Sequence, residues 1–311
     1  MSRSRWSAAA ASLVAILLLA TGCTSTKWNA EKPMWVIATT NFTETNLISQ
    51  MYLQVLLAGG FDAEIKQLST REVIVPALEA GEVQITPEYL GSLTEYLNKS
   101  INGPSAPQIA TGDEAATFAA AQGLAAQRNL TLLTPSPAQD QNAFAVTREL
   151  AAANRLVTMS DLAAYSQNNP VILGGPPECP QRPFCEPGLE TVYGMKIAEF
   201  LPLDAGGPLT VQALNQGKIT TGLVFSSSGS ISGNDLVVLE DDKNLQTAEN
   251  LTPALFTPAV QPDVTKLLDN VSAALTTDEL RQLNEQVEIY RKNPRLVAQD
   301  FLQSKGLLPP S

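Results

Sequence analysis

The sequence predicts an α/β protein built as two lobes, and three observations support this. In the first part of the chain, short apolar runs typical of strands alternate with segments whose apolar residues recur at helical spacing. A cluster of turn residues, PSPAQDQN, lies within residues 134 to 142 and interrupts this alternation, and a second alternation follows it. Helical patterns then dominate the end of the chain. We therefore expect the chain to cross from one lobe to the other and back.

The first lobe is expected to contain a parallel sheet flanked by helices. Its predicted strands are residues 35 to 39, 64 to 68, 83 to 85 and 130 to 133. A first helix is predicted through residues 47 to 56 and stops at a pair of glycines. Ser69 with Glu72, and Thr111 with Glu114, have the spacing of capping boxes and predict where two further helices begin.

The second lobe and the return segment show the same kinds of pattern. Helices are predicted near residues 160 to 165, 189 to 193 and 210 to 216, and strands at 171 to 173, 221 to 225 and 236 to 239. Three final helices are predicted at residues 263 to 275, 277 to 288 and 295 to 305 and should pack on the first lobe. The predicted division is 34–139 for the first part of lobe I, 140–246 for lobe II and 247–311 for the return to lobe I.

The composition excludes several classes of function. The chain has 311 residues and no histidine, so a Ser-His-Asp or Cys-His catalytic relay and a His-ligated metal are impossible. Its 31 acidic and 20 basic residues give a formal charge of -11, which opposes binding to a phosphate backbone. We expect no nucleic-acid partner, no metal and no cofactor.

The N-terminus has the pattern of an export signal. Arg3 and Arg5 precede an apolar run of 13 residues, from position 8 to 20, which is shorter than the roughly 20 residues of a membrane-spanning helix. Small residues then lead to Cys23, and this ending resembles a bacterial lipobox. The resemblance implies a signal peptide at 1–22, a lipid on Cys23 and a tether at 23–33, which would hold the protein on the outer face of the cytoplasmic membrane. Without Arg3 and Arg5 the charge becomes -13.

Two further cysteines lie close together in a proline-rich segment, PPECPQRPFCEPG. Cys179 and Cys185 are six positions apart, and an exported chain is found where disulfides persist. We expect a local disulfide that constrains the loop carrying Arg182. A zinc site would need more ligands than this neighbourhood offers.

Five ordered motifs carry a resemblance to a known family. They are ATTNFTETNLISQMYLQVL at 38 to 56, LEAGEVQITPEYLGSLTEYL at 78 to 97, the stretch from GGPPE through RPFCEPGLETVYG at 174 to 194, LVVLEDDK at 236 to 243, and LTTDELRQLNEQV at 275 to 287. Together they resemble the glycine betaine/carnitine/choline substrate-binding proteins of ABC importers, of the ProX, OpuBC and OpuCC type. The resemblance implies a type II periplasmic-binding-protein fold, with two crossings and a ligand cleft between the lobes.

In that family, aromatic rings hold a quaternary ammonium head by cation–π attraction, and polar groups hold the substrate carboxylate. By resemblance, Tyr89 and Phe225 occupy positions of the aromatic box, and Ser92 matches a hydroxyl residue that contacts the carboxylate. Arg182 matches an arginine that clamps the carboxylate. Thr40 stands where some members have a carboxylate-binding lysine, so that positive charge is absent.

Two box positions depart from the family pattern. Asn142 and Glu249 replace aromatic residues, and the loss of two rings should remove about 1–4 kcal/mol of cation–π attraction, at about 0.5–2 per ring. Glu249 could instead hold a cation, and Asn142 could read a hydroxyl or carbonyl group. Asn41, at a strand-to-helix turn, is a further candidate, since the backbone N–H groups of the first helical turn could meet an anion.

Each of these residues also has a structural interpretation. Tyr89 and Phe225 could be core aromatics, and Asn41 could only cap the helix. Arg182 could form a surface ion pair with Glu178 or Glu186. Two other tyrosines, at positions 96 and 193, are expected to pack rather than to bind.

The leading hypothesis is a monomeric, lipid-anchored, non-enzymatic receptor. It would close its lobes around an osmoprotectant-like solute and deliver it to an ABC permease and its ATPase. The departures at Asn142 and Glu249 motivate an alternative with the same fold and a polyol, phenolic or other polar non-quaternary ligand. A secreted enzyme that uses two carboxylates among Glu44, Glu88 and Glu249 is the remaining hypothesis.

Overall fold

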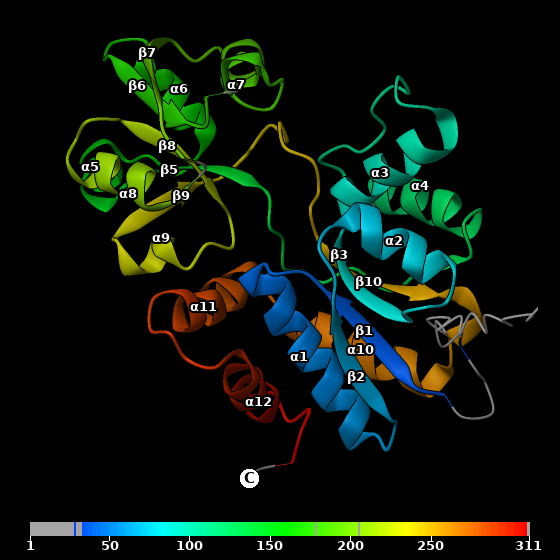
Figure 1. Cartoon of the computed structure of the whole chain (residues 1–311). Coiled ribbons are helices and arrows are strands. Elements are labelled where there is room, and N and C mark those ends of the chain that lie inside the picture. The colour runs from blue at the N-terminus through cyan, green and yellow to red at the C-terminus, as the bar shows by residue number, and fades with distance from the viewer. Residues whose placement is uncertain (1–27, 29–32, 178, 205, 310–311) are drawn as a thin grey trace, which may run out of the picture.

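The structure is a computed structural model that describes residues 28, 33–177, 179–204 and 206–309. Two five-stranded sheets form the centres of two lobes (Figure 1). The chain builds four strands of the first sheet, then all five strands of the second, and returns to the first sheet with β10.

The sheet of the first lobe has the order β2-β1-β3-β10-β4. Its strands are β1 (Trp35–Thr39), β2 (Ala63–Gln67), β3 (Ile85–Tyr89), β4 (Leu130–Leu132) and β10 (Leu251–Phe256). The expectation of a parallel sheet is only partly right, because β1 is parallel to β2 and β3 whereas β10 is antiparallel to β3 and β4. The difference arises because β10 returns from the second lobe and starts beside Tyr89, at the end of the sheet where β3 finishes.

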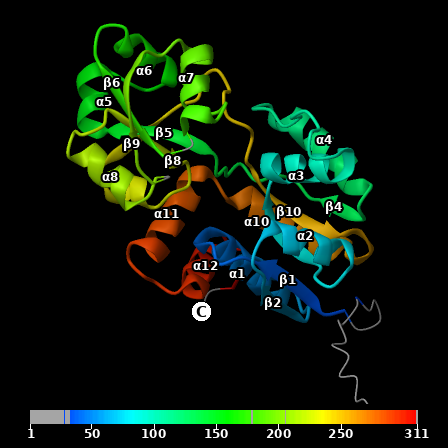
Figure 2. The same ribbon diagram turned by 45° about the horizontal axis from the view of Figure 1, so that its top comes forward.

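Seven helices of the described chain belong to the first lobe. They are α1 (Thr43–Ala58), α2 (Arg71–Glu79), α3 (Leu90–Asn102), α4 (Glu114–Ala126), α10 (Pro262–Ala274), α11 (Thr277–Glu288) and α12 (Pro294–Ser304). Apolar residues of α1 lie in one buried cluster with residues of α10, α11 and α12, which confirms that the final helices pack on this lobe. Figure 2 shows the C-terminal helices beside α1.

Several predicted boundaries in the first lobe are wrong by a few residues. The helix starts are capped one to two positions later than the capping-box patterns suggest, since Thr70 and Asp113 are the N-cap residues. The predicted strand at 83 to 85 is the entry to a strand that continues to Tyr89. Polar and proline residues hid this strand, although four of its five residues are buried between its neighbours.

The sheet of the second lobe has the order β7-β6-β8-β5-β9. Its strands are β5 (Asn142–Thr147), β6 (Val171–Gly175), β7 (Ile197–Pro202), β8 (Thr221–Phe225) and β9 (Leu236–Leu239). Its helices are α5 (Arg148–Asn154), α6 (Met159–Ser166), α7 (Glu186–Tyr193), α8 (Pro208–Asn215) and α9 (Ser230–Gly233). No element was predicted from the sequence at α5, β5, β7 or α9.

Helix α11 of the first lobe also contacts the second lobe. The guanidinium of Arg281 donates to the backbone carbonyl of Ser226 at 2.9 and 3.1 Å, and Asn284 Nδ2 donates to the carbonyl of Ser227 at 3.0 Å. Gly229 packs so closely on this helix that an added Cβ would lie 2.4 Å from the backbone nitrogen of Glu285. The segment that follows β8 is therefore docked on α11.

Trp28 fixes the beginning of the described chain to the first lobe. Its ring lies 4.9 Å from that of Trp35 in an edge-to-face arrangement, and its backbone N–H donates to the carbonyl of Gly81. Trp35 begins β1, whereas Thr39 and Tyr89 are the last residues of β1 and β3. The contact therefore lies at the opposite end of the sheet from Thr39 and Tyr89. Within the described residues, no helix has the length and apolar character needed to cross a membrane.

Candidate functional site: the cleft between the lobes

A cavity of about 1020 Å³ lies between the two lobes. The first lobe lines it with residues of α2, the end of β3, α3 and the loop at 104 to 108. The second lobe contributes Arg182, Phe184 and Phe225, and the two crossing segments contribute Asp140 to Asn142 and Gln246 to Glu249. The cavity is therefore built by both lobes and by the segments that join them, the arrangement expected of a site that opens and closes.

Five aromatic side chains line this cleft. Two of them, Tyr89 and Phe225, were predicted from the sequence, whereas Phe42, Tyr96 and Phe184 were not. Phe42 and Phe225 are 43% and 37% exposed, so both rings present apolar surface that a ligand in the cavity can cover.

The three aromatic residues that were not predicted lie in segments that carry the family resemblance. Phe42 follows Asn41, and Phe184 lies two positions after Arg182, so both stand inside motifs that carry the family resemblance. Tyr96, which was expected only to pack, is half-buried on α3 and lines the same cavity. The position of these aromatic residues within the family motifs, close to candidate polar residues, was the signal that could have found them.

The ring of Tyr89 is held by a buried carboxyl group. Its hydroxyl donates to Oε1 of Glu44 at 2.5 Å, and Asn284 Nδ2 donates to Oε2 of the same group at 2.6 Å. Glu44 is fully buried, and desolvation together with the charge of nearby Asp140 raises its pKa to about 8. Asp140 in turn accepts a hydrogen bond from the hydroxyl of Ser227 at 2.7 Å. The network joins the cleft wall to both lobes.

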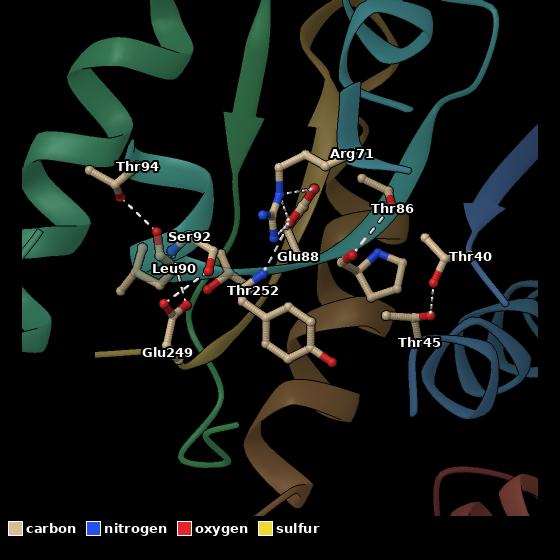
Figure 3. A network of polar contacts seen from close by, with 12 residues as sticks. Thr40, Thr45, Arg71, Thr86, Glu88, Leu90, Ser92, Thr94, Glu249 and Thr252 are labelled. Carbon is tan, nitrogen blue, oxygen red and sulfur yellow. Dashed lines mark hydrogen bonds and ion pairs between the residues drawn. The ribbon is translucent and has the colours of Figure 1, made fainter. Parts of the chain in front are cut away.

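The carboxylate of Glu249 lies on the first turn of α3. Its Oε2 accepts from the backbone N–H of Ser92 at 2.9 Å, and its Oε1 accepts from the hydroxyl of Ser92 at 3.0 Å and from that of Thr247 at 3.2 Å. Tyr89, the N-cap residue of α3, makes no side-chain cap. Glu249 therefore supplies the cap from a distant segment, as Figure 3 shows. Burial raises the pKa of Glu249 in spite of these donors and of Arg71.

An ion pair at the cleft wall is formed by Arg71 and Glu88. The guanidinium Nε and Nη2 donate to the carboxylate at 3.0 and 2.8 Å, and the Glu88 side chain is 5% exposed (Figure 3). Glu44, Glu88 and Glu249, the carboxylates of the enzyme hypothesis, are thus all bound by neighbouring groups of the protein.

A disulfide between Cys179 and Cys185 closes the loop that carries Arg182 and Phe184 into the cleft, with 5.2 Å between the Cα atoms. Both cysteines are buried in the core of the second lobe. The expected local bridge is therefore present, and it anchors two cleft residues to a packed core.

The other residues that the sequence suggested as ligand-binding or lipid-carrying lie in different parts of the molecule. Asn142 lines the cleft and pairs with Phe225 across neighbouring strands. Thr40 lines a side cavity of about 190 Å³ behind Tyr89, where its hydroxyl lies 2.8 Å from that of Thr45. Asn41 is exposed and lines neither cavity, and it does not cap the helix, since Phe42 is the N-cap of α1. Cys23 lies outside the described residues.

Similarity to known proteins extends over nearly the whole described chain. The glycine betaine-binding protein YehZ of Escherichia coli (strain K12) is 28% identical over 274 residues, which cover 85% of this chain and 88% of that protein. A glycine-betaine-binding protein of Pseudomonas aeruginosa is 25% identical over 281 residues, with 86% of each chain covered.

Solved structures agree with these sequence relatives. Apo YehZ from Escherichia coli superposes with a TM-score of 0.78 at 25% identity, over 88% of this chain and 99% of that chain. A glycine betaine/carnitine/choline ABC transporter structure superposes with a TM-score of 0.77 at 23% identity, over 88% and 99%. The expected type II periplasmic-binding-protein fold is thereby confirmed.

The family itself is shown by a match to its sequence profile. The profile described as the substrate binding domain of ABC-type glycine betaine transport system matches residues 35–304. This span holds both lobes and every element described above. The chain therefore belongs to the family of substrate-binding domains of ABC-type glycine betaine transport systems, which are transport proteins and not enzymes.

Proposed function

We propose that this protein captures a quaternary-ammonium osmoprotectant in the cleft between its lobes and delivers it to an ABC permease driven by its ATPase. The observation that carries the proposal is the set of five aromatic rings around one cavity, in a chain of the glycine betaine transport family. Such rings attract a quaternary ammonium group through their faces. The family favours this ligand class over the polyol or phenolic alternative.

Each cleft wall has a proposed role in binding. Tyr89 and Phe225 present ring faces to the ammonium group, together with Phe42, Tyr96 and Phe184, and these rings offset the aromatic residues lacking at Asn142 and Glu249. Arg182 lies on the wall of the second lobe, where it contacts the ligand after the lobes close. Closure brings the two walls together, and the closed form is what the permease recognises.

Isothermal titration calorimetry of the chain without residues 1 to 23 tests this proposal. Choline, glycine betaine, carnitine, proline betaine and glycerophosphocholine are the ligands, and at least one should bind. Phe225→Leu should weaken that binding by about 0.5–2 kcal/mol, because it removes one ring face. Phe200→Leu, a half-buried residue of the same lobe outside the cleft, is the matched control and should leave the affinity unchanged.

The outcome that contradicts the proposal is the absence of heat with all five compounds, together with unchanged uptake of each after deletion of the gene. Small-angle X-ray scattering checks closure separately, since the radius of gyration should fall when the bound ligand is added. An unchanged radius at saturation would exclude lobe closure while leaving ligand binding intact.

We further propose that a lipid on Cys23 holds the protein, as a monomer, on the outer face of the cytoplasmic membrane. The support is the lipobox-like ending of the apolar run before Cys23. Metabolic labelling with a fatty acid should mark the wild-type chain and not Cys23→Ala, which should instead be released into the soluble exported fraction. Equal labelling of both chains would exclude this anchor.

A further inference from the structure

The first turn of α3 is the part of the cleft wall where backbone donors would otherwise face a ligand. The N–H groups of Leu90 and Gly91 donate to the carbonyls of Asn250 and Ala248 at 3.0 and 2.9 Å. The N–H and hydroxyl of Ser92 both donate to Glu249. The segment that carries Glu249 thus satisfies the donors of this turn, and its carboxylate sits at the positive end of a helix of 13 residues.

Ser92 is therefore committed to a carboxylate of the protein itself. The family resemblance assigned Ser92 to the carboxylate of the ligand, but here both of its donors are bound to Glu249. A ligand carboxylate that approaches this turn meets a negative charge in place of donors. Such repulsion is a common source of specificity, because it acts against one ligand without requiring a new contact to the other.

The other charged side chains of the cleft do not offset the repulsion between Glu249 and a ligand carboxylate. The cleft lining holds four acidic side chains, Glu72, Glu95, Asp140 and Glu249, and three basic ones, Arg71, Lys99 and Arg182. Arg71, which lies near Glu249, is held by three hydrogen bonds to a further carboxylate, that of Glu88. The wall around α3 and β3 therefore favours a cation and opposes an anion.

We propose that Glu249 is a specificity-determining residue that selects ammonium alcohols over carboxylate-bearing zwitterions of the same size. The inference rests on the proposed function, and it narrows the ligand class within it. Choline and glycine betaine are a matched pair for this purpose, since they share a trimethylammonium group and differ in a hydroxymethyl group against a carboxylate. Choline carries only a positive charge. Glycine betaine carries a carboxylate as well, and this carboxylate would be repelled by that of Glu249.

Calorimetry with choline and glycine betaine on the exported chain tests the proposal directly. The wild-type protein should bind choline at least about tenfold more tightly than glycine betaine. Glu249→Gln keeps the size of the side chain and removes its charge, so it should weaken choline, strengthen glycine betaine and shift the ratio of the two affinities by about tenfold or more. Circular dichroism and thermal unfolding of the variant establish that α3 remains folded.

Glu72→Gln is the matched control. It removes the same charge from an exposed carboxylate of the same cavity that has no hydrogen bond to Ser92, and it should change the ratio by less than about threefold. Glycine betaine binding as tightly as choline in the wild-type protein overturns the inference and leaves the proposed function intact. An equal shift of the ratio in both variants overturns the role of Glu249. Absence of binding by either compound overturns the inference, and it overturns the proposed function only if the other three osmoprotectants also fail.

Discussion

At the scale of single residues, the buried carboxyl group of Glu44 is the most unusual feature of the molecule. It is fully buried, its neighbours are a tyrosine hydroxyl and an amide, and no cation is hydrogen-bonded to it among the described residues. It stands in the first turn of α1, where a negative charge is normally favourable, yet burial dominates and raises its pKa to about 8. Burial in the folded protein therefore favours the protonated form of this carboxyl.

This proton makes the stability depend on pH. Between pH 4.5, the ordinary pKa of the group, and about pH 8, the folded state holds a proton that the unfolded state has lost, so the free energy of unfolding falls as pH rises. Glu44→Gln removes that proton exchange. The stability of the variant relative to the wild type should therefore increase by up to about 1.4 kcal/mol for each pH unit in this window. Urea unfolding at several pH values measures the difference.

Glu64→Gln is the control for this prediction, because it makes the same change on an exposed residue of β2. If Glu44→Gln and Glu64→Gln gave parallel stability curves between pH 5 and about pH 8, Glu44 would not be the protonated group.

The family resemblance predicted which residues line the cleft, but it did not predict which groups of the protein those residues contact. Tyr89, Ser92, Asn142, Arg182, Phe225 and Glu249 all line the predicted cleft. The engagement of Ser92 by Glu249 could not be predicted, since 157 positions separate the two residues and only the return of the chain beside α3 brings them together. The role of Glu44 was hidden for the same reason, because Asn284 lies 240 positions away.

At the scale of elements, the disulfide loop shows how a short segment without regular strands can hold part of a binding wall. The bridge closes six positions of chain between two buried sulfurs, and Arg182 and Phe184 lie inside it. The closed loop has few conformations to lose on binding.

Removal of the bridge should therefore cost both stability and affinity. Cys179→Ala with Cys185→Ala should lower the free energy of unfolding by about 2 kcal/mol, as expected for a loop of this length, and should weaken the ligand that the wild type binds. Denaturant unfolding and calorimetry measure the two effects. Wild-type protein unfolded in a strong reductant should show the same loss of stability, whereas the variant should be insensitive to the reductant. Identical unfolding curves for variant and oxidised wild type would contradict this prediction.

Element prediction succeeded where apolar periodicity was strong and failed where it was broken by polar residues. The ranges of β8, β9 and α11 agree with their predictions, because each is bounded by turn or capping residues and has a clear apolar face. In contrast, β3 reads ITPEY, and its burial depends on neighbours from both ends of the chain. Local patterns cannot report such long-range burial.

At the scale of the whole molecule, the contact between α11 and the segment after β8 joins the lobes outside the two crossings. Gly229 allows the closest approach, since a Cβ at this position would lie 2.4 Å from the nitrogen and 2.5 Å from the Cα of Glu285. Arg281 and Asn284 hold the adjacent carbonyls. The close approach of the lobes at this contact therefore requires a residue without a side chain at position 229.

Gly229→Ala should push the lobes apart. Overpacking of this kind costs about 1–3 kcal/mol, so the melting temperature should fall, and small-angle X-ray scattering of the ligand-free protein should give a larger radius of gyration. Gly233→Ala, at the end of the short helix that Gly229 caps, is the matched control, because its added Cβ would come no closer than 3.6 Å to Glu285. An unchanged radius and melting temperature for Gly229→Ala would show that the contact does not set the lobe angle.

The two-lobed architecture was easier to predict from the sequence than the element boundaries or the contacts of single residues. The interruption at residues 134 to 142 and the helices after residue 262 were visible in the sequence, and the structure moves between its sheets after β4 and after β9. The docking of α11 on the second lobe was not visible, because α11 was assigned wholly to the first lobe by its apolar face. Its polar face carries the interlobe contacts through Arg281 and Asn284.

The contact between Trp28 and Trp35 fixes the point at which the N-terminal segment joins the first lobe. If Cys23 carries the proposed lipid, the five residues before Trp28 can span at most about 18 Å. Trp28 is attached to the first lobe where β1 begins. This is the opposite end of the sheet from Tyr89, which lines the cleft. A lipid on Cys23 would therefore attach the first lobe directly to the bilayer, and the second lobe would be connected to the membrane only through the first.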